Sequence, residues 1–273
     1  MAVLFGALLH ASWNARVKAS ADKELDTALI HIIGSALALP FVLVLGLPDR
    51  ASWPYMAVSI TIHIAYYLAL TGAYRHGDLG LTYPVMRGVA PVLVAVSTQA
   101  TLGEPLTLGG WVGVLAVSVG VLMLGLQPGA LERPRALAFA LANAVVIAAY
   151  TVVDGLGVRA SGDAMRYVAL LFLLDGWPFG LLVLRRRGFA RSSAYARARW
   201  RIASLAACAS LGSYGIALWA MTRAPVALVA ALRETSVLFA VILGSWLLHE
   251  PFTRRRALGA TGIALGVIAL RVS

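Results

Sequence analysis

The sequence predicts an all-α integral membrane protein with ten transmembrane helices, built from two inverted five-helix repeats. Three observations lead to this fold class: the composition, a series of apolar segments of membrane-spanning length, and an internal duplication. Of the 273 residues, 60% are hydrophobic and only 13% are charged, which is more apolar surface than one soluble core can bury. We therefore expect lipid to be the main solvent of the chain, and we do not expect a soluble enzyme.

The apolar segments are separated by short polar breaks. Crossing about 30 Å of hydrocarbon takes roughly 20 residues as a helix, and a helix satisfies its own backbone hydrogen bonds in lipid. The first segment has no basic stretch before it, so we interpret it as a membrane helix rather than a signal peptide. The ten predicted helices cover residues 1–18, 25–46, 53–74, 79–100, 106–126, 135–157, 164–184, 201–221, 226–248 and 255–271.

Basic residues concentrate in alternating loops, above all between Arg185 and Arg201. A net charge of +11 would suggest nucleic acid as the partner of a soluble protein, but basic loops between apolar segments follow the positive-inside rule. We expect a multi-pass protein of the inner (plasma) membrane that binds no nucleic acid. The charge bias places the loop from Arg185 to Arg201 in the cytoplasm and both termini outside.

No signature of a metal or cofactor site is present in the sequence. Cys208 is the single cysteine, and no Cys/His cluster has metal-ligand spacing. The run from Gly155 to Ala160 imitates a dinucleotide fingerprint but lacks the preceding strand, and there is no phosphate-binding P-loop. We expect no metal, no cofactor and no ATP-driven pumping by this chain.

An internal duplication is visible when the sequence is offset by 146 residues, which superposes the fourth and fifth predicted helices on the ninth and tenth. Weaker matches at offsets of 138 and 141 relate earlier segments, so two units, residues 1–127 and 134–271, carry their helices in the same order. Five helices are an odd number, so the second unit is expected to cross the membrane in the opposite sense. Inverted repeats are common in secondary transporters, because two such halves can open a central site to alternate sides. The matched positions include Arg87 with Arg233, Glu104-Pro105 with Glu250-Pro251, Gly113 with Gly259, and Gly120 with Gly266.

Several short motifs also occur in a characteristic order: His10 to Asn14, Tyr83-Pro84, Leu102 to Pro105, Arg233 to Ser236, and His249 to Pro251. In these motifs the chain resembles the drug/metabolite transporter superfamily, specifically its ten-helix EamA-type members. The resemblance implies duplicated five-helix units, a pathway lined mainly by helices other than the fifth and tenth, and export of amino acids, related metabolites or drugs. It also implies cytoplasmic termini, which is the opposite of the charge bias, so the orientation stays open.

Arg87 and Arg233 are the first candidates for substrate binding. Both lie well inside an apolar segment and at equivalent positions of the repeat, where an arginine costs about 3 kcal/mol or more. A guanidinium presents a planar donor fork that suits a carboxylate or phosphonate. The alternative is a structural ion pair with Asp154, Asp175 or Glu234.

Asp175 and Glu234 are candidates for proton coupling. Asp175 lies near the middle of its segment and precedes Gly176 and Pro178, which loosen a helix. Broken helices at the membrane midplane favour substrate and ion sites. The alternative for both acids is a salt bridge, and we expect Asp154 to lie at the membrane interface.

Polar and aromatic residues of other segments complete the predicted substrate site. Aromatic side chains with a polar tip suit an amphipathic metabolite, although the same residue types form interfacial belts or pack between helices. These further candidates are His63, Tyr66, Tyr67, Trp13, Asn14, Tyr214 and Trp219.

Glycines line one face of the fifth and tenth predicted helices, at Gly113 and Gly120 and again at Gly259 and Gly266. Small residues at this spacing predict close helix packing, either within one chain or in a homodimer. Glu104-Pro105 is expected to begin the fifth helix.

The sequence thus favours a secondary transporter, an exporter of a small metabolite such as an amino acid or a related zwitterion or anion, with membrane lipid as its surroundings. The alternatives are an organic-cation or drug exporter built on Asp175 or Glu234, and a flippase of lipid head groups.

Overall fold

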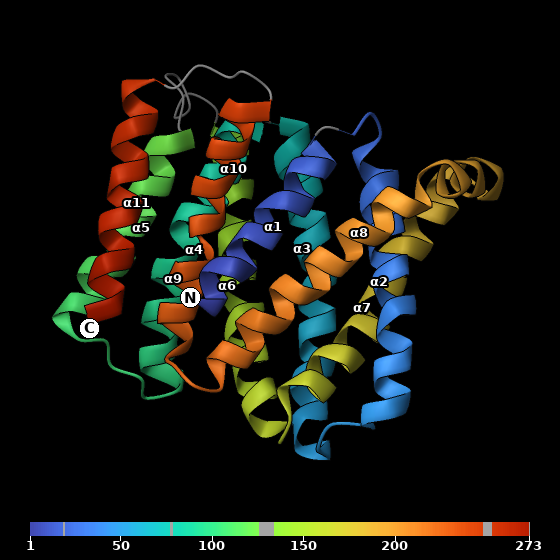
Figure 1. The fold of residues 1–273 in the computed structure, drawn as a ribbon, viewed down its shortest axis with the longest axis horizontal. Coiled ribbons are helices and arrows are strands. Elements are labelled where there is room, and N and C mark those ends of the chain that lie inside the picture. The colour runs from blue at the N-terminus through green and yellow to red at the C-terminus, as the bar shows by residue number, and fades with distance from the viewer. Residues whose placement is uncertain (19, 77–78, 126–133, 248–252, 273) are drawn as a thin grey trace.

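The computed structural model describes the chain except residues 19, 77–78, 126–133, 248–252 and 273. The described residues form helices and turns and no strand (Figure 1). Five helices (α2, α5, α6, α7 and α8) are long and apolar enough to cross a membrane, so the chain is a membrane protein. The helices are α1 (Ala2–Lys18), α2 (Lys23–Leu45), α3 (Trp53–His76), α4 (Leu79–Thr101), α5 (Leu108–Gly125), α6 (Pro134–Ala160), α7 (Ala164–Arg187), α8 (Phe189–Met221), α9 (Val226–Arg233), α10 (Thr235–Leu247) and α11 (Arg254–Val272), with a 3₁₀ turn η1 (Arg50–Ser52).

Each predicted segment contains a described helix, but the segment 226–248 is not one continuous helix. It is divided at Glu234 into α9 and α10. The N–H of Glu234 donates to the carbonyl of Ala231 at 3.1 Å, and the N–H of Val237 donates to the carbonyl of Glu234 at 3.0 Å. This three-residue spacing is that of a 3₁₀ turn, a frequent form of break within helices.

The predicted loop between Arg185 and Arg201 is wrong, because most of it is the first part of α8. Its polar residues would not form a stable membrane helix, but several of its arginines pair with acids of α2. Arg191 lies 3.1 Å from Asp22, and Arg199 lies 3.5 Å from Asp26. These tertiary ion pairs hold a helix where composition alone predicts a loop.

The described turns lie at two opposite ends of the bundle. The turns that join α2 to α3, α4 to α5, α6 to α7 and α8 to α9 lie at the lower end in Figure 1, whereas the turn between α7 and α8 lies at the upper end. At the lower end, the N–H of Asp49 donates to the carbonyl of Ser161 at 3.1 Å. Large side chains between these ends are exposed, such as Val145 and Leu265, as expected for a surface that faces lipid.

Helices of the N-terminal part of the chain pack mainly on helices of the C-terminal part. α3 packs on α6 and α8 packs on α1, while α2 packs on α7 and α5 packs on α11.

Glycines bring α5 and α11 into backbone contact. A Cβ atom on Gly120 would lie 2.7 Å from the carbonyl oxygen of Gly259, and one on Gly266 would lie 2.9 Å from that of Gly113. The close packing that these glycines predict is therefore made within one chain, and the glycine faces give no support to a homodimer.

Candidate substrate site

The centre of the molecule is occupied by α9, a helix of only eight residues. Its side chains are almost fully buried, with Val226, Ala227 and Ala231 at 0% exposure, and it contacts α1, α4, α5, α6 and α8. It ends at Arg233, and the break at Glu234 follows. A discontinuous helix within a membrane protein is a common position for a substrate site.

Arg87 of α4 forms a buried ion pair with Glu234. The Arg87 Nε atom lies 2.9 Å from Glu234 Oε2, and the two residues are 7% and 4% exposed. Arg87 Nη2 also lies 3.3 Å from His10 Nε2 of α1 and donates to Ser236 Oγ of α10 at 3.4 Å. Of the two interpretations of Arg87, the ion pair is therefore present, and its partner is Glu234.

Arg233, the equivalent residue of the second half, has a different environment. Its Cζ atom lies 5.1 Å from the ring centroid of Tyr214 on α8, a cation–π geometry. Within the part of the chain that the structure describes, Arg233 makes no ion pair. Its guanidinium is thus available for a further anion.

Asp154 is completely buried, with 0% exposure. The hydroxyl of Tyr214 donates to Asp154 Oδ2, and the hydroxyl of Tyr167 donates to Oδ1 at 3.0 Å. Asp154, which was expected at the membrane interface, thus connects α6 to α7 and α8, and α6 continues beyond it to Ala160.

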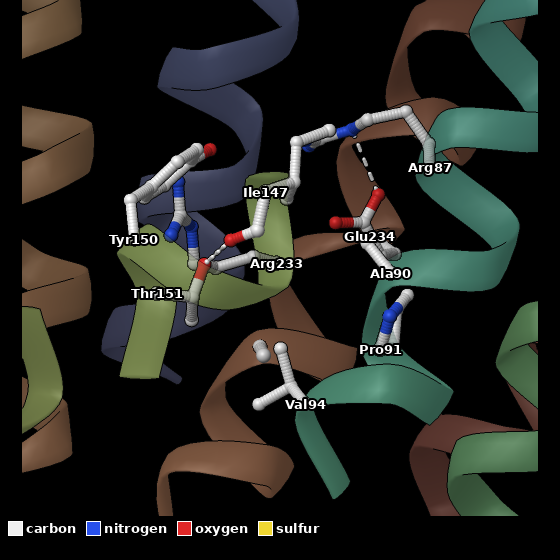
Figure 2. A pocket seen from close by; sticks show the side chains of 10 residues that line it. Arg87, Ala90, Pro91, Val94, Ile147, Tyr150, Thr151, Arg233 and Glu234 are labelled. Atoms are coloured by element: carbon white, nitrogen blue, oxygen red, sulfur yellow. Dashed lines mark hydrogen bonds and ion pairs between the residues drawn. The ribbon is translucent and has the colours of Figure 1, made fainter. Parts of the chain in front are cut away.

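Arg87, Arg233 and Glu234 line one small cavity. Figure 2 shows Arg87 and Glu234 on one side of it and Arg233 beside Tyr150 and Thr151 on the other. The remaining lining is apolar and comes from Ala90, Pro91, Val94, Ile147 and Ala230. The cavity thus combines two guanidinium groups and one carboxylate with an apolar wall.

Tyr150 separates this cavity from a second polar cluster on α3 and α7. The rings of His63 and Tyr150 are 4.6 Å apart, and Tyr66 meets Tyr150 edge-on at 6.1 Å. His63 Nδ1 lies 3.4 Å from Asp175 Oδ1, and His31 of α2 interacts electrostatically with both. The rings of His63 and Tyr150, tilted by 36° to each other, therefore lie between Asp175 and the cavity.

Other predicted site residues are not brought to the cavity. Trp13 meets the ring of His10 at 5.3 Å but packs against α2 and α8, and the side chain of Asn14 donates to the carbonyl of its own helix at His10. Trp219 is 37% exposed and contacts Arg223. The side chain of Tyr67 lies outside the described residues.

Sequence reasoning missed several polar residues on one face of α6. Asn143, Tyr150, Thr151 and Asp154 are buried, and their spacing of seven, one and three residues is that of a single helical face. This polar stripe within an apolar segment was the available signal. Among the described residues, no group of three His, Cys, Asp or Glu side chains could hold a metal ion.

Comparisons with known proteins bear on the family and the fold of the chain. The sequence profile of the EamA-like transporter family matches residues 134–272, and no curated protein matches the chain. Among solved structures, 29 chains match. One of them, described only as the crystal structure of a protein, covers 99% of this chain with 98% of its own, at 19% identity and a TM-score of 0.73. At that identity the likeness shows the fold alone.

Proposed function

Because the chain belongs to the EamA-like transporter family, we propose that it is a secondary transporter that exports a small zwitterionic or anionic metabolite, such as an amino acid. The family membership makes it a drug/metabolite transporter and not an enzyme. The export direction rests on the resemblance to EamA-type transporters, and alternating access and the substrate class rest on the arguments below.

Alternating access is supported by the relation between the two halves. The sequence repeat equates α1 with α6, α2 with α7, α3 with α8 and α5 with α11. Under this exchange, the contact of α3 with α6 becomes that of α8 with α1, and the contacts of α2 with α7 and α5 with α11 are unchanged. Two units of this kind, residues 1–127 and 134–271 in inverted orientation, can exchange conformations about a central site.

The charge of the cavity supports an anionic or zwitterionic substrate. Glu234 compensates Arg87, whereas no described carboxylate pairs with Arg233, so the cavity retains a positive charge. An uncompensated guanidinium in a low-dielectric site favours a carboxylate or another oxyanion. A carboxylate of the substrate would then bind at Arg233, between Tyr150 and Tyr214.

The described acids argue against an organic cation as the substrate. Such a ligand would need an available acid, but Glu234 pairs with Arg87 and Asp175 lies beside His63.

Thermal stabilisation of the purified protein tests the proposal, since a ligand that binds only the folded state raises the unfolding midpoint. The panel contains amino acids, phosphonates, organic cations and soluble lipid head groups. We expect stabilisation by zwitterions or anions that is lost in Arg233→Gln and kept in Arg223→Gln, a control arginine that is exposed and stacked on Trp219. Stabilisation by organic cations alone would contradict the substrate class, and stabilisation by head groups alone would favour a flippase.

A further inference from the structure

A cluster of ionic and hydrogen-bonding contacts joins three segments at the lower end of the bundle in Figure 1. Glu104 Oε1, in the turn between α4 and α5, lies 2.6 Å from Arg159 Nη1 near the end of α6. Arg159 also donates from Nε to the carbonyl of Met221 at 2.8 Å and from Nη2 to the carbonyl of Ala224 at 3.2 Å. We call the ion pair of Glu104 with Arg159 the latch.

The second carboxylate oxygen of Glu104 accepts a hydrogen bond at the start of α9. The N–H of Val226 donates to Glu104 Oε2 at 3.0 Å, so Glu104 accepts one of the backbone donors that a helix start leaves without a partner. The expectation that Glu104 begins α5 is therefore wrong: α5 starts at Leu108, and Glu104 caps a helix of the other half.

Tight packing holds the same end of α9 against α6. A Cβ atom on Gly155 would lie 2.7 Å from Val226 Cγ2, so the two helices approach more closely there than any larger residue allows. Both the latch and this contact fix the position of Val226 relative to α6.

The other end of α9 is the substrate site. Eight residues of helix rise about 12 Å, which is less than half of a hydrocarbon core about 30 Å thick. A rigid helix of this length transmits a displacement of Val226 to Arg233. The latch and the cavity are therefore connected by one short, buried element.

We propose that the latch of Glu104 and Arg159 closes the lower end of the bundle over the cavity and must open when the cavity opens to that side. The inference rests on the proposed alternating access. It assigns to both residues a positioning role: when the latch separates, α9 is released from the turn between α4 and α5, and Arg233 moves with it. Because the side chains are 17% and 30% exposed, water can replace the contact at each opening.

Access to the cavity from each side of the membrane tests the latch. The reporter is Ala230→Cys on α9, which lines the cavity, in a Cys208→Ser background that removes the exposed native thiol. A small membrane-impermeant thiol reagent is applied to either face of oriented vesicles. We expect Glu104→Gln to raise the labelling rate from the face of the latch by about tenfold, equivalent to ~1.4 kcal/mol, with no rise from the opposite face.

A matched control exists near the opposite end of the bundle. Glu24→Gln removes the nearer of two acidic partners of Arg187, at 2.6 Å with side chains 28% and 32% exposed, and should leave the labelling of the reporter unchanged. Arg159→Lys keeps the charge but loses the donor fork, so it should raise labelling from the same face to a smaller extent. It replaces Glu104→Gln as the test variant if Glu104→Gln does not fold.

An unchanged rate, or an equal rise from both faces, would overturn the latch. The labelling uses no substrate, so its outcome is separate from that of the ligand panel. If the ligand panel fails while Glu104→Gln labels from one face, the substrate class is wrong and the latch stands.

Discussion

Arg87 and Arg233 occupy equivalent positions of the repeat but have different partners. Arg87 is held by Glu234, His10 and Ser236, whereas Arg233 lies on the ring of Tyr214. The two arginines therefore differ in what they contact. Arg87 joins α4 to Glu234 and to α10, whereas Arg233 lines the cavity and pairs with no described carboxylate.

Substitution of Arg233 should therefore affect substrate binding more than folding. We expect Arg233→Gln to weaken the binding of an anionic ligand by roughly 10- to 100-fold, because a hydrogen bond to a charged group contributes about 1.5–3 kcal/mol. Arg233→Lys keeps the charge and should lose less. Titration calorimetry measures both, and equal affinities of wild type and Arg233→Gln would exclude a role in binding.

Substitution of Glu234 should mainly affect stability. Glu234→Gln leaves the guanidinium of Arg87 buried without a counter-charge, and the expected loss is about 3–5 kcal/mol. Glu24→Gln, which breaks a partly exposed pair, should cost about 1 kcal/mol or less.

Thermal or denaturant unfolding in detergent measures this difference. Adding Arg87→Met to Glu234→Gln removes the orphaned charge, so the double variant should regain much of the lost stability. A double variant less stable than Glu234→Gln would contradict the assignment.

Asp175 is the candidate for proton coupling, because it contacts His63, whose ring lies against Tyr150 in the cavity wall. If it carries the coupled proton, Asp175→Asn abolishes uphill transport driven by a pH gradient but preserves exchange of substrate at equal pH. Proteoliposome assays distinguish the two activities. Uphill transport at the wild-type rate in Asp175→Asn would rule out this role.

At the level of residues, the sequence located the buried charges but not their pairing. Arg87, Arg233 and Glu234 stand out because charge is rare in apolar segments. Which acid reaches which arginine depends on how α4 packs against α9. Arg87 and Glu234 are 147 positions apart, so no local pattern encodes their contact. The end of α6 was predicted three residues too early, at 157 instead of Ala160.

Among the elements, α5 and α11 form the closest helix pair, and its glycines predict a specific sensitivity. Gly120→Ala places a methyl group 2.7 Å from the carbonyl oxygen of Gly259, so the helices must separate, at a cost of about 1–3 kcal/mol. Gly262→Ala is the matched control on the same interface, since its Cβ would lie 3.5 Å from Gly120, an ordinary contact.

Unfolding midpoints of the two variants measure the effect. We expect a clear decrease for Gly120→Ala and little change for Gly262→Ala. Equal midpoints would mean that α5 and α11 do not approach as closely as described.

Hydropathy predicted where helices lie better than how they end. The period and length of an apolar segment depend on local sequence, so each predicted segment contains a helix. The break at Glu234 and the extension of α8 to Phe189 depend instead on tertiary contacts. Glu234 forms an ion pair with Arg87 of α4. The arginines of α8 form ion pairs with acids at the start of α2.

For the whole molecule, α9 connects a central cavity to one end of the bundle. Glu104 of the latch holds the start of this helix, and Arg233 lies at its end. In the proposed mechanism, substrate binding and closure of the lower end would therefore act on the same short element.

Substrate counterflow tests the central claim most directly. Proteoliposomes are loaded with an unlabelled ligand from the stabilising panel and diluted into a trace of the same ligand carrying a radiolabel, without ATP or an ion gradient. If the protein works by alternating access, we expect a transient accumulation of label inside the proteoliposomes. Arg233→Gln should abolish this accumulation and Arg223→Gln should preserve it. No accumulation by folded protein that binds the ligand would contradict transport by alternating access.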